Sequence, residues 1–200
     1  MRLLGSAMLA AALLTAVAGA VTAAVGARRG DPALQARGRR CAALLLTETT
    51  LAFAVLEVAF GRSDFSYATV AAHSSLGTPF FYQLTAAWSS QEGSLLLWLW
   101  LLSGWTVLSA RLTHRRLGDV AAYAQAVLLC FGAFFAGLLV SLASPFAGLA
   151  TAPADGAGLD PLLRARIAPE EHDRAEQELF AAVLETKRLR EEDRSSYTTS

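Results

Sequence analysis

The chain has 200 residues, of which 54% are hydrophobic and only 17% are charged, and its formal net charge is zero. A soluble domain carries about 25% charged residues, so this composition favours a membrane protein over a soluble one. A chain with zero net charge offers no overall basic surface for nucleic acid, and we expect no nucleic-acid partner.

Four apolar segments account for most of the hydrophobic residues. A bilayer core about 30 Å thick requires roughly 20 apolar residues of helix. The segments 3–25, 41–60, 94–110 and 120–142 approach or exceed this length. The first and fourth carry no charge and are rich in small residues, which suit close helix packing in lipid. The sequence therefore predicts an all-α, polytopic membrane protein with about four transmembrane helices.

Two acids interrupt the second segment. Glu48 and Glu57 are nine residues apart, which places them on opposite faces of a helix and prevents them from forming a carboxylate pair. An ionisable group within lipid is a functional candidate. Glu57 is close enough to the end of the span to reach water, whereas Glu48 has either a function or a packing role. The cysteines, Cys41 and Cys130, lie in apolar runs and are interpreted as small buried hydrophobes.

Arginines between the segments predict the orientation, because cytoplasmic loops retain positive charge. The loops after the first and third segments hold eight arginines between them: Arg28, Arg29, Arg37, Arg39, Arg40, Arg111, Arg115 and Arg116. The loop after the second holds only Arg62. We therefore expect a multi-pass protein of the cell (inner or plasma) membrane, with the N-terminus, residues 61–93 and residues 143 onward extracytoplasmic. A cleaved signal peptide is the alternative for the first segment, but it would move five arginines outside.

The stretch between the second and third segments contains three candidate site residues, His73, Trp88 and Glu92. Trp88 suits an anchor at the level of the lipid headgroups. Glu92 opens the third span, where the helix dipole favours an acid, and we expect it to cap the helix near Ser94 or to hold the preceding loop. His73 is either a solvated loop histidine or a ligand.

Two groups of motifs in this chain resemble the N-terminal part of the CcmF-type cytochrome c biogenesis proteins, the haem lyase family. The first group comprises Asp64–Ser66, Val70–Ala71, His73–Ser75, Pro79, Tyr82, Trp88 and Glu92–Trp98. The second group comprises Ser144–Phe146 and Asp155–Leu163, with Asp160 where the family usually has Asn. The resemblance covers roughly residues 41–163, and it suggests a CcmF-like transmembrane region over residues 1–163.

The resemblance implies a role in cytochrome c maturation, in which haem is delivered and attached to apocytochrome c outside the membrane. It implies haem as the cofactor, and the membrane, other maturation proteins and apocytochrome c as partners. Haem is flat and apolar with two propionates, so aromatic surfaces and imidazoles suit it. His73, Trp88 and Glu92 are then the candidate haem-binding residues, with Glu92 expected to act mainly through structure.

The chain departs from the family pattern after residue 163. It lacks the His-Pro-Pro sequence and the tryptophan-rich loop that supply the family's haem contacts, and His172 lies in a charged context that does not match. The sequence therefore does not decide whether the chain itself is an enzyme, although the family is called haem lyase. A membrane scaffold that binds no haem and a truncated, nonfunctional fragment are the alternatives. Residues 164–200 are expected to form a polar, charged helical tail, either solvated or bound to a partner.

Overall fold

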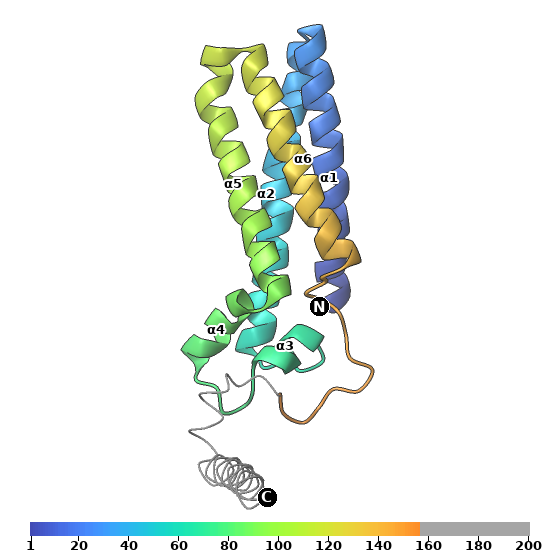
Figure 1. Ribbon diagram of the computed structural model, residues 1–200, viewed down its shortest axis with the longest axis vertical. Coiled ribbons are helices and arrows are strands. Elements are labelled where there is room, and N and C mark those ends of the chain that lie inside the picture. The colour runs from blue at the N-terminus through green and yellow to red at the C-terminus, as the bar shows by residue number, and fades with distance from the viewer. Residues whose placement is uncertain (157–200) are drawn as a thin grey trace, which may run out of the picture. The chain divides into compact units, whose positions relative to one another are not determined.

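The computed structural model describes residues 1–156, which form six α-helices and no strand. These are α1 (Arg2–Arg29), α2 (Pro32–Gly61), α3 (Ala68–His73), α4 (Phe80–Ser89), α5 (Gln91–Leu117) and α6 (Asp119–Ser141). The four long helices lie alongside one another, and the short α3 and α4 lie at the end that holds the N-terminus (Figure 1). The predicted all-α class is confirmed for these residues, while the predicted tail, 164–200, lies outside them.

The four long helices are each long and apolar enough to cross a membrane, which confirms the predicted number of spans in the described residues. They are longer than expected at the arginine-rich end, where the predicted loop of residues 26–40 is helical except for a two-residue turn. Alanine, arginine, leucine and glutamine all favour helix, so the charge of this segment does not interrupt it. At 1.5 Å per residue, α2 with its 30 residues is about 45 Å long and extends beyond a 30 Å bilayer core.

The turn between α1 and α2 consists of Gly30 and Asp31. Gly30 adopts the left-handed conformation (φ 61°), which a residue without a Cβ enters without strain. Asp31 then caps α2, because its Oδ1 accepts hydrogen bonds from the backbone N–H groups of Ala33 (2.8 Å) and Leu34 (3.3 Å). Pro32, the first residue of α2, needs no hydrogen-bond acceptor there.

Small residues hold the long helices close together, as their density in the first and fourth segments predicts. A Cβ on Gly38 of α2 would lie only 2.9 Å from the Cβ of Ala23 on α1. About half of the buried residues of the two alanine-rich helices are alanine: Ala12, Ala16, Ala20, Ala23 and Ala27 in α1, and Ala121, Ala122, Ala126 and Ala136 in α6. Close backbone approach through small residues is the packing that lipid-embedded helices favour.

The outward faces of the four helices are apolar as well. Only 28–33% of each spanning window is buried inside the bundle, and large apolar side chains such as Leu14, Phe131 and Trp105 are exposed. Such a surface suits lipid and not water. The interpretation of both cysteines as buried is wrong for this reason: Cys130 is exposed and Cys41 only half-buried, since an apolar residue in a membrane helix faces lipid as readily as the core.

Candidate functional site

Two segments far apart in the sequence meet at the end of the bundle that holds α3 and α4. We call this region, residues 62–90 together with residues 142–156, the cap. The backbone N–H of Ala68 donates to the carbonyl oxygen of Ala147 (2.9 Å), and the N–H of Leu149 donates to the carbonyl oxygen of Ser66 (3.1 Å). Tyr67 and Gly148 stand opposite each other between these two bonds. The segment that follows α6 is therefore fixed to the segment that follows α2.

The start of α1 joins the same contact. Arg2 donates a hydrogen bond from Nη1 to the carbonyl oxygen of Ser66 (3.3 Å), and its guanidinium lies where a Cβ on Gly148 would be. The ring of Phe146 covers Gly5 of α1 and packs edge-on against the ring of Tyr67, with centroids 6.4 Å apart. The first and last described segments thus hold Tyr67 between them.

A second contact joins the Asp-Gly motif to the serine pair before α4. The Oδ1 of Asp155 accepts a hydrogen bond from the N–H of Leu76 (2.8 Å). Gly156 lies so close to Ser74 that a Cβ would overlap the Ser74 carbonyl oxygen. Both motifs were visible in the sequence, but the contact between them is a property of the fold. The predicted topology gave one indication of it, because it placed both motifs at the same end of the spans.

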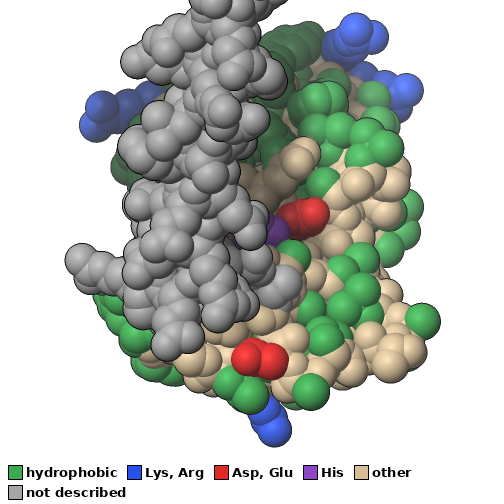
Figure 2. All heavy atoms as spheres, turned by 60° about the horizontal axis from the view of Figure 1, so that its bottom comes forward, with side chains coloured by type: hydrophobic (Ala, Val, Ile, Leu, Met, Phe, Trp, Pro, Cys, Tyr) green, Lys and Arg blue, Asp and Glu red, His purple; other side chains and the backbone are tan. Residues whose placement is uncertain are grey.

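His73 is the last residue of α3, where it is half-buried. Its Nδ1 lies 3.0 Å from the carbonyl oxygen of Thr69. A carbonyl oxygen can only accept, so Nδ1 carries a hydrogen, and in the neutral ring Nε2 then has the lone pair that a metal would use. In the view onto this end of the molecule (Figure 2), histidine and acidic side chains lie among apolar and uncharged groups.

Trp88 lies on α4 with about half of its surface exposed. Its Nε1 donates a hydrogen bond to the Oε1 of Glu57 (3.1 Å), near the end of α2. Glu57, which the sequence left free to reach water, is thereby fixed to the cap. Glu48 has a different partner, since its Oε1 accepts from the hydroxyl of Thr15 on α1 (3.0 Å). The two acids therefore do not form a pair, as their spacing predicts.

Glu92 lies in the first turn of α5, where the helix dipole favours its charge. The side-chain cap of this helix is Ser90, whose Oγ accepts from the N–H of Gly93 (3.0 Å) and donates to the carbonyl oxygen of Ala87 (3.0 Å). A Cβ on Gly93 would overlap that carbonyl oxygen, so this position requires glycine. The helix begins at Gln91, before the expected start near Ser94.

The three predicted site residues lie on three different helices, and each has its own surroundings. Within residues 1–156, no three His, Cys, Asp or Glu side chains lie close enough to hold a metal ion together. His73 offers one imidazole nitrogen. An imidazole is a group that can ligate haem iron.

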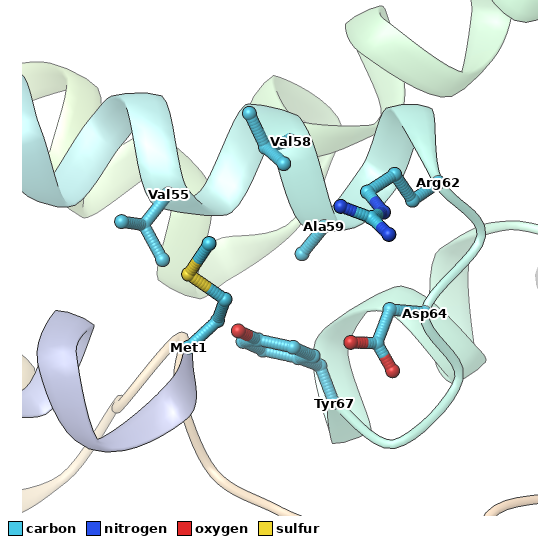
Figure 3. Close-up of a pocket in the computed structure, with 7 residues that line it drawn as sticks. All are labelled: Met1, Val55, Val58, Ala59, Arg62, Asp64 and Tyr67. Carbon is cyan, nitrogen blue, oxygen red and sulfur yellow. The ribbon is translucent and has the colours of Figure 1, made fainter.

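Sequence reasoning missed a cavity of about 390 Å³ at the junction of α1, α2 and the segment before α3. Its lining residues are Met1, Val55, Val58, Ala59, Arg62, Asp64 and Tyr67 (Figure 3). Tyr67 is 1% exposed, and its hydroxyl has no hydrogen-bond partner among the described residues. Burial raises the pKa of Tyr67, with a further increase from the Asp64 carboxylate and an opposing effect from Arg2. The sequence did contain a signal for this cavity, because a base, an acid and a tyrosine (Arg62, Asp64 and Tyr67) directly follow the second predicted span.

The fold and this end of the molecule define a polytopic α-helical membrane protein with four spans and a cap built from two distant segments. No protein-family model matches the chain. The cytochrome c-type biogenesis protein CycK of Rhizobium meliloti (strain 1021) is 34% identical over 161 residues, which cover 80% of this chain and 24% of CycK. The CcmF protein of Escherichia coli (strain K12) is 35% identical over 162 residues, 80% of this chain and 25% of CcmF.

A solved structure named cytochrome c haem lyase CcmF has the same fold. It superposes with a TM-score of 0.64 at 29% sequence identity, over 72% of this chain and 24% of the lyase chain. The chain is therefore homologous to the CcmF-type cytochrome c biogenesis proteins and corresponds to their N-terminal part, as the motifs predict. It spans about a quarter of the length of the curated relatives it matches.

Proposed function

We propose that this chain is a membrane component of cytochrome c maturation that acts in the delivery or attachment of haem to apocytochrome c, as part of a complex. Its relatives are named cytochrome c-type biogenesis proteins. The observation that carries the proposal is the contact between the two groups of family motifs in the cap. Gly156 of the second group lies against Ser74 of the first, and Asp155 accepts a hydrogen bond from Leu76, which directly follows the first group's serine pair. Membrane insertion alone does not require the two groups of motifs to contact each other.

The proposed orientation places the cap on the extracytoplasmic side. The arginine-rich ends of the helices, with Arg28, Arg29 and Arg37 at the α1–α2 turn, lie at the opposite end of the bundle from the cap. Positive charge is retained in the cytoplasm during insertion into the inner membrane. The cap would then face the compartment in which haem is attached to apocytochrome c.

Haem enters this proposal as cargo, and the cap offers two features suited to it. The Nε2 of His73 is available for the iron, because Nδ1 is engaged by the Thr69 carbonyl oxygen. The half-exposed ring of Trp88 is held in place by Glu57 and can lie against a flat apolar macrocycle. Other maturation proteins would supply the attachment chemistry.

Haem titration of the purified full chain tests the proposal. We expect a Soret band that is lost in His73→Ala and retained in His114→Ala, a control at the arginine-rich end of α5. A band that is unchanged in His73→Ala would contradict the assignment of His73. A protein that stays colourless yet co-purifies with maturation proteins would support the alternative role, a membrane scaffold that binds partners without haem.

A further inference from the structure

The cavity beside Tyr67 continues into the membrane-facing surface of the bundle. A groove of about 220 Å³ adjoins it and shares Met1, Val55 and Val58 with it. The other residues of the groove are all apolar, with Leu4 and Met8 from α1 and Leu51 and Ala54 from α2. From Leu51 to Val58 the groove follows α2 for about two turns, or roughly 10 Å. A polar cavity at the helix ends is thus joined to an apolar groove along the spans.

We propose that this combined site binds one phospholipid with a zwitterionic, primary-amine headgroup. The headgroup would occupy the cavity, and one acyl chain would lie in the groove between α1 and α2. The inference rests on the membrane-spanning fold and does not require the chain to handle haem.

The unpartnered Tyr67 hydroxyl is the strongest indication of a ligand. A buried hydroxyl without a partner is costly, and native structures rarely contain one. The ring of Tyr67 is fixed by Phe146 and by the backbone contact with Gly148, so the hydroxyl cannot turn away to water. In Figure 3 it points between Met1 and the α2 side chains, into the cavity. A phosphate oxygen of the headgroup would accept its hydrogen bond.

The charges around the cavity match the same headgroup. Arg62 follows α2 and contributes a guanidinium, which pairs well with phosphate. Asp64 contributes a carboxylate, and its Oδ1 already accepts from the backbone N–H of Ser66 (3.2 Å), which orients it. A base and an acid at one cavity suit a headgroup that carries both a phosphate and an ammonium. A lipid with only a negative headgroup would leave Asp64 beside the phosphate.

Native mass spectrometry of the full chain in detergent, titrated with palmitoyl-oleoyl phosphatidylethanolamine, tests this proposal. We expect one bound lipid in the wild type. Tyr67→Phe and Arg62→Gln should each weaken retention by about tenfold, equivalent to roughly 1.4 kcal/mol. Tyr82→Phe, at an exposed tyrosine on α4, is the matched control and should bind as the wild type does.

A second set of measurements tests whether the cavity selects this headgroup over other ligands. Asp64→Asn should remove any preference for phosphatidylethanolamine over phosphatidylglycerol while leaving a lipid bound. The added lipid should also raise the melting temperature of the wild type but not that of Tyr67→Phe, which keeps the aromatic ring and hence the contact with Phe146. Equal retention by the wild type and Tyr67→Phe would overturn the proposal. Haem binding that depends on the Tyr67 hydroxyl would do so as well, by assigning the cavity to a different ligand.

Discussion

Tyr67 combines burial, a fixed ring and a hydroxyl without a partner in the described part of the chain. Its surroundings could not be predicted from sequence, because Arg2 and Phe146 come from segments 65 or more residues away. The sequence indicated that its segment was informative, but periodicity carries no information on which distant residues will cover a side chain.

The raised pKa of Tyr67 predicts a loss of stability at high pH. The folded chain holds the phenol proton above the ordinary pKa of 10.0, whereas the unfolded chain releases it there. This contribution is fully present below pH 10 and is lost as the pH rises through the raised pKa of the folded state. The melting temperature in detergent should therefore fall over the pH interval that begins at about 10. Tyr67→Phe should fall less over that interval; parallel curves for the two proteins would contradict the prediction.

Gly93 is the residue at which α4 and α5 approach too closely for a side chain. A methyl group there would overlap the Ala87 carbonyl oxygen, which belongs to the backbone and cannot rotate away. We expect Gly93→Ala to destabilise the protein by about 1–3 kcal/mol, measured as a lower melting temperature. The control is Gly104→Ala on the same helix, where the nearest atom is 4.0 Å away. That variant should be neutral or slightly more stable, since alanine favours helix.

At the scale of the elements, hydropathy predicted all four spans but misjudged where they end. The arginine-rich segment 28–40 was interpreted as a loop because charged side chains are unfavourable in lipid. In the structure this segment is mostly helical and extends α1 and α2 beyond the length of a bilayer core. The short helices α3 and α4 had no signal of this kind. On α4 the buried side carries Gln83, whose amide donates to the hydroxyl of Ser63, while Phe80, Phe81 and Trp88 are exposed. Ala86 and Ala87 are buried on the same helix, and its ten residues are too few for a membrane span, so hydropathy gave no signal for α4.

The α1–α2 turn makes a testable element, because a single side chain caps the second span. We expect Asp31→Ala to cost about 0.5–2 kcal/mol, since two backbone N–H groups lose their acceptor. Asp31→Asn should stay close to the wild type, because asparagine caps about as well. Thermal unfolding followed by circular dichroism measures the difference; equal losses in both variants would assign the effect to charge and not to capping.

At the scale of the whole molecule, composition and hydropathy were sufficient to predict a polytopic helical membrane protein. The region for which we propose a function was predictable only through motifs, and the contacts between its two segments required the fold. The contacts between the two segments of the cap pair residues near 70 with residues near 150, as in the Asp155–Leu76 bond. The haem-binding residues remain predictions, since His73, Trp88 and Glu92 lie on separate helices.

The proposed function depends most directly on the side of the membrane that the cap faces. Single cysteines introduced into a chain without Cys41 and Cys130 can be tested with a membrane-impermeant maleimide on intact cells or spheroplasts. Leu76→Cys, at an exposed position in the cap, should be labelled from outside, and Ala33→Cys, exposed at the arginine-rich end, should be labelled only after lysis. Labelling of Ala33→Cys from outside, with Leu76→Cys protected until lysis, would contradict an extracytoplasmic role in haem handling.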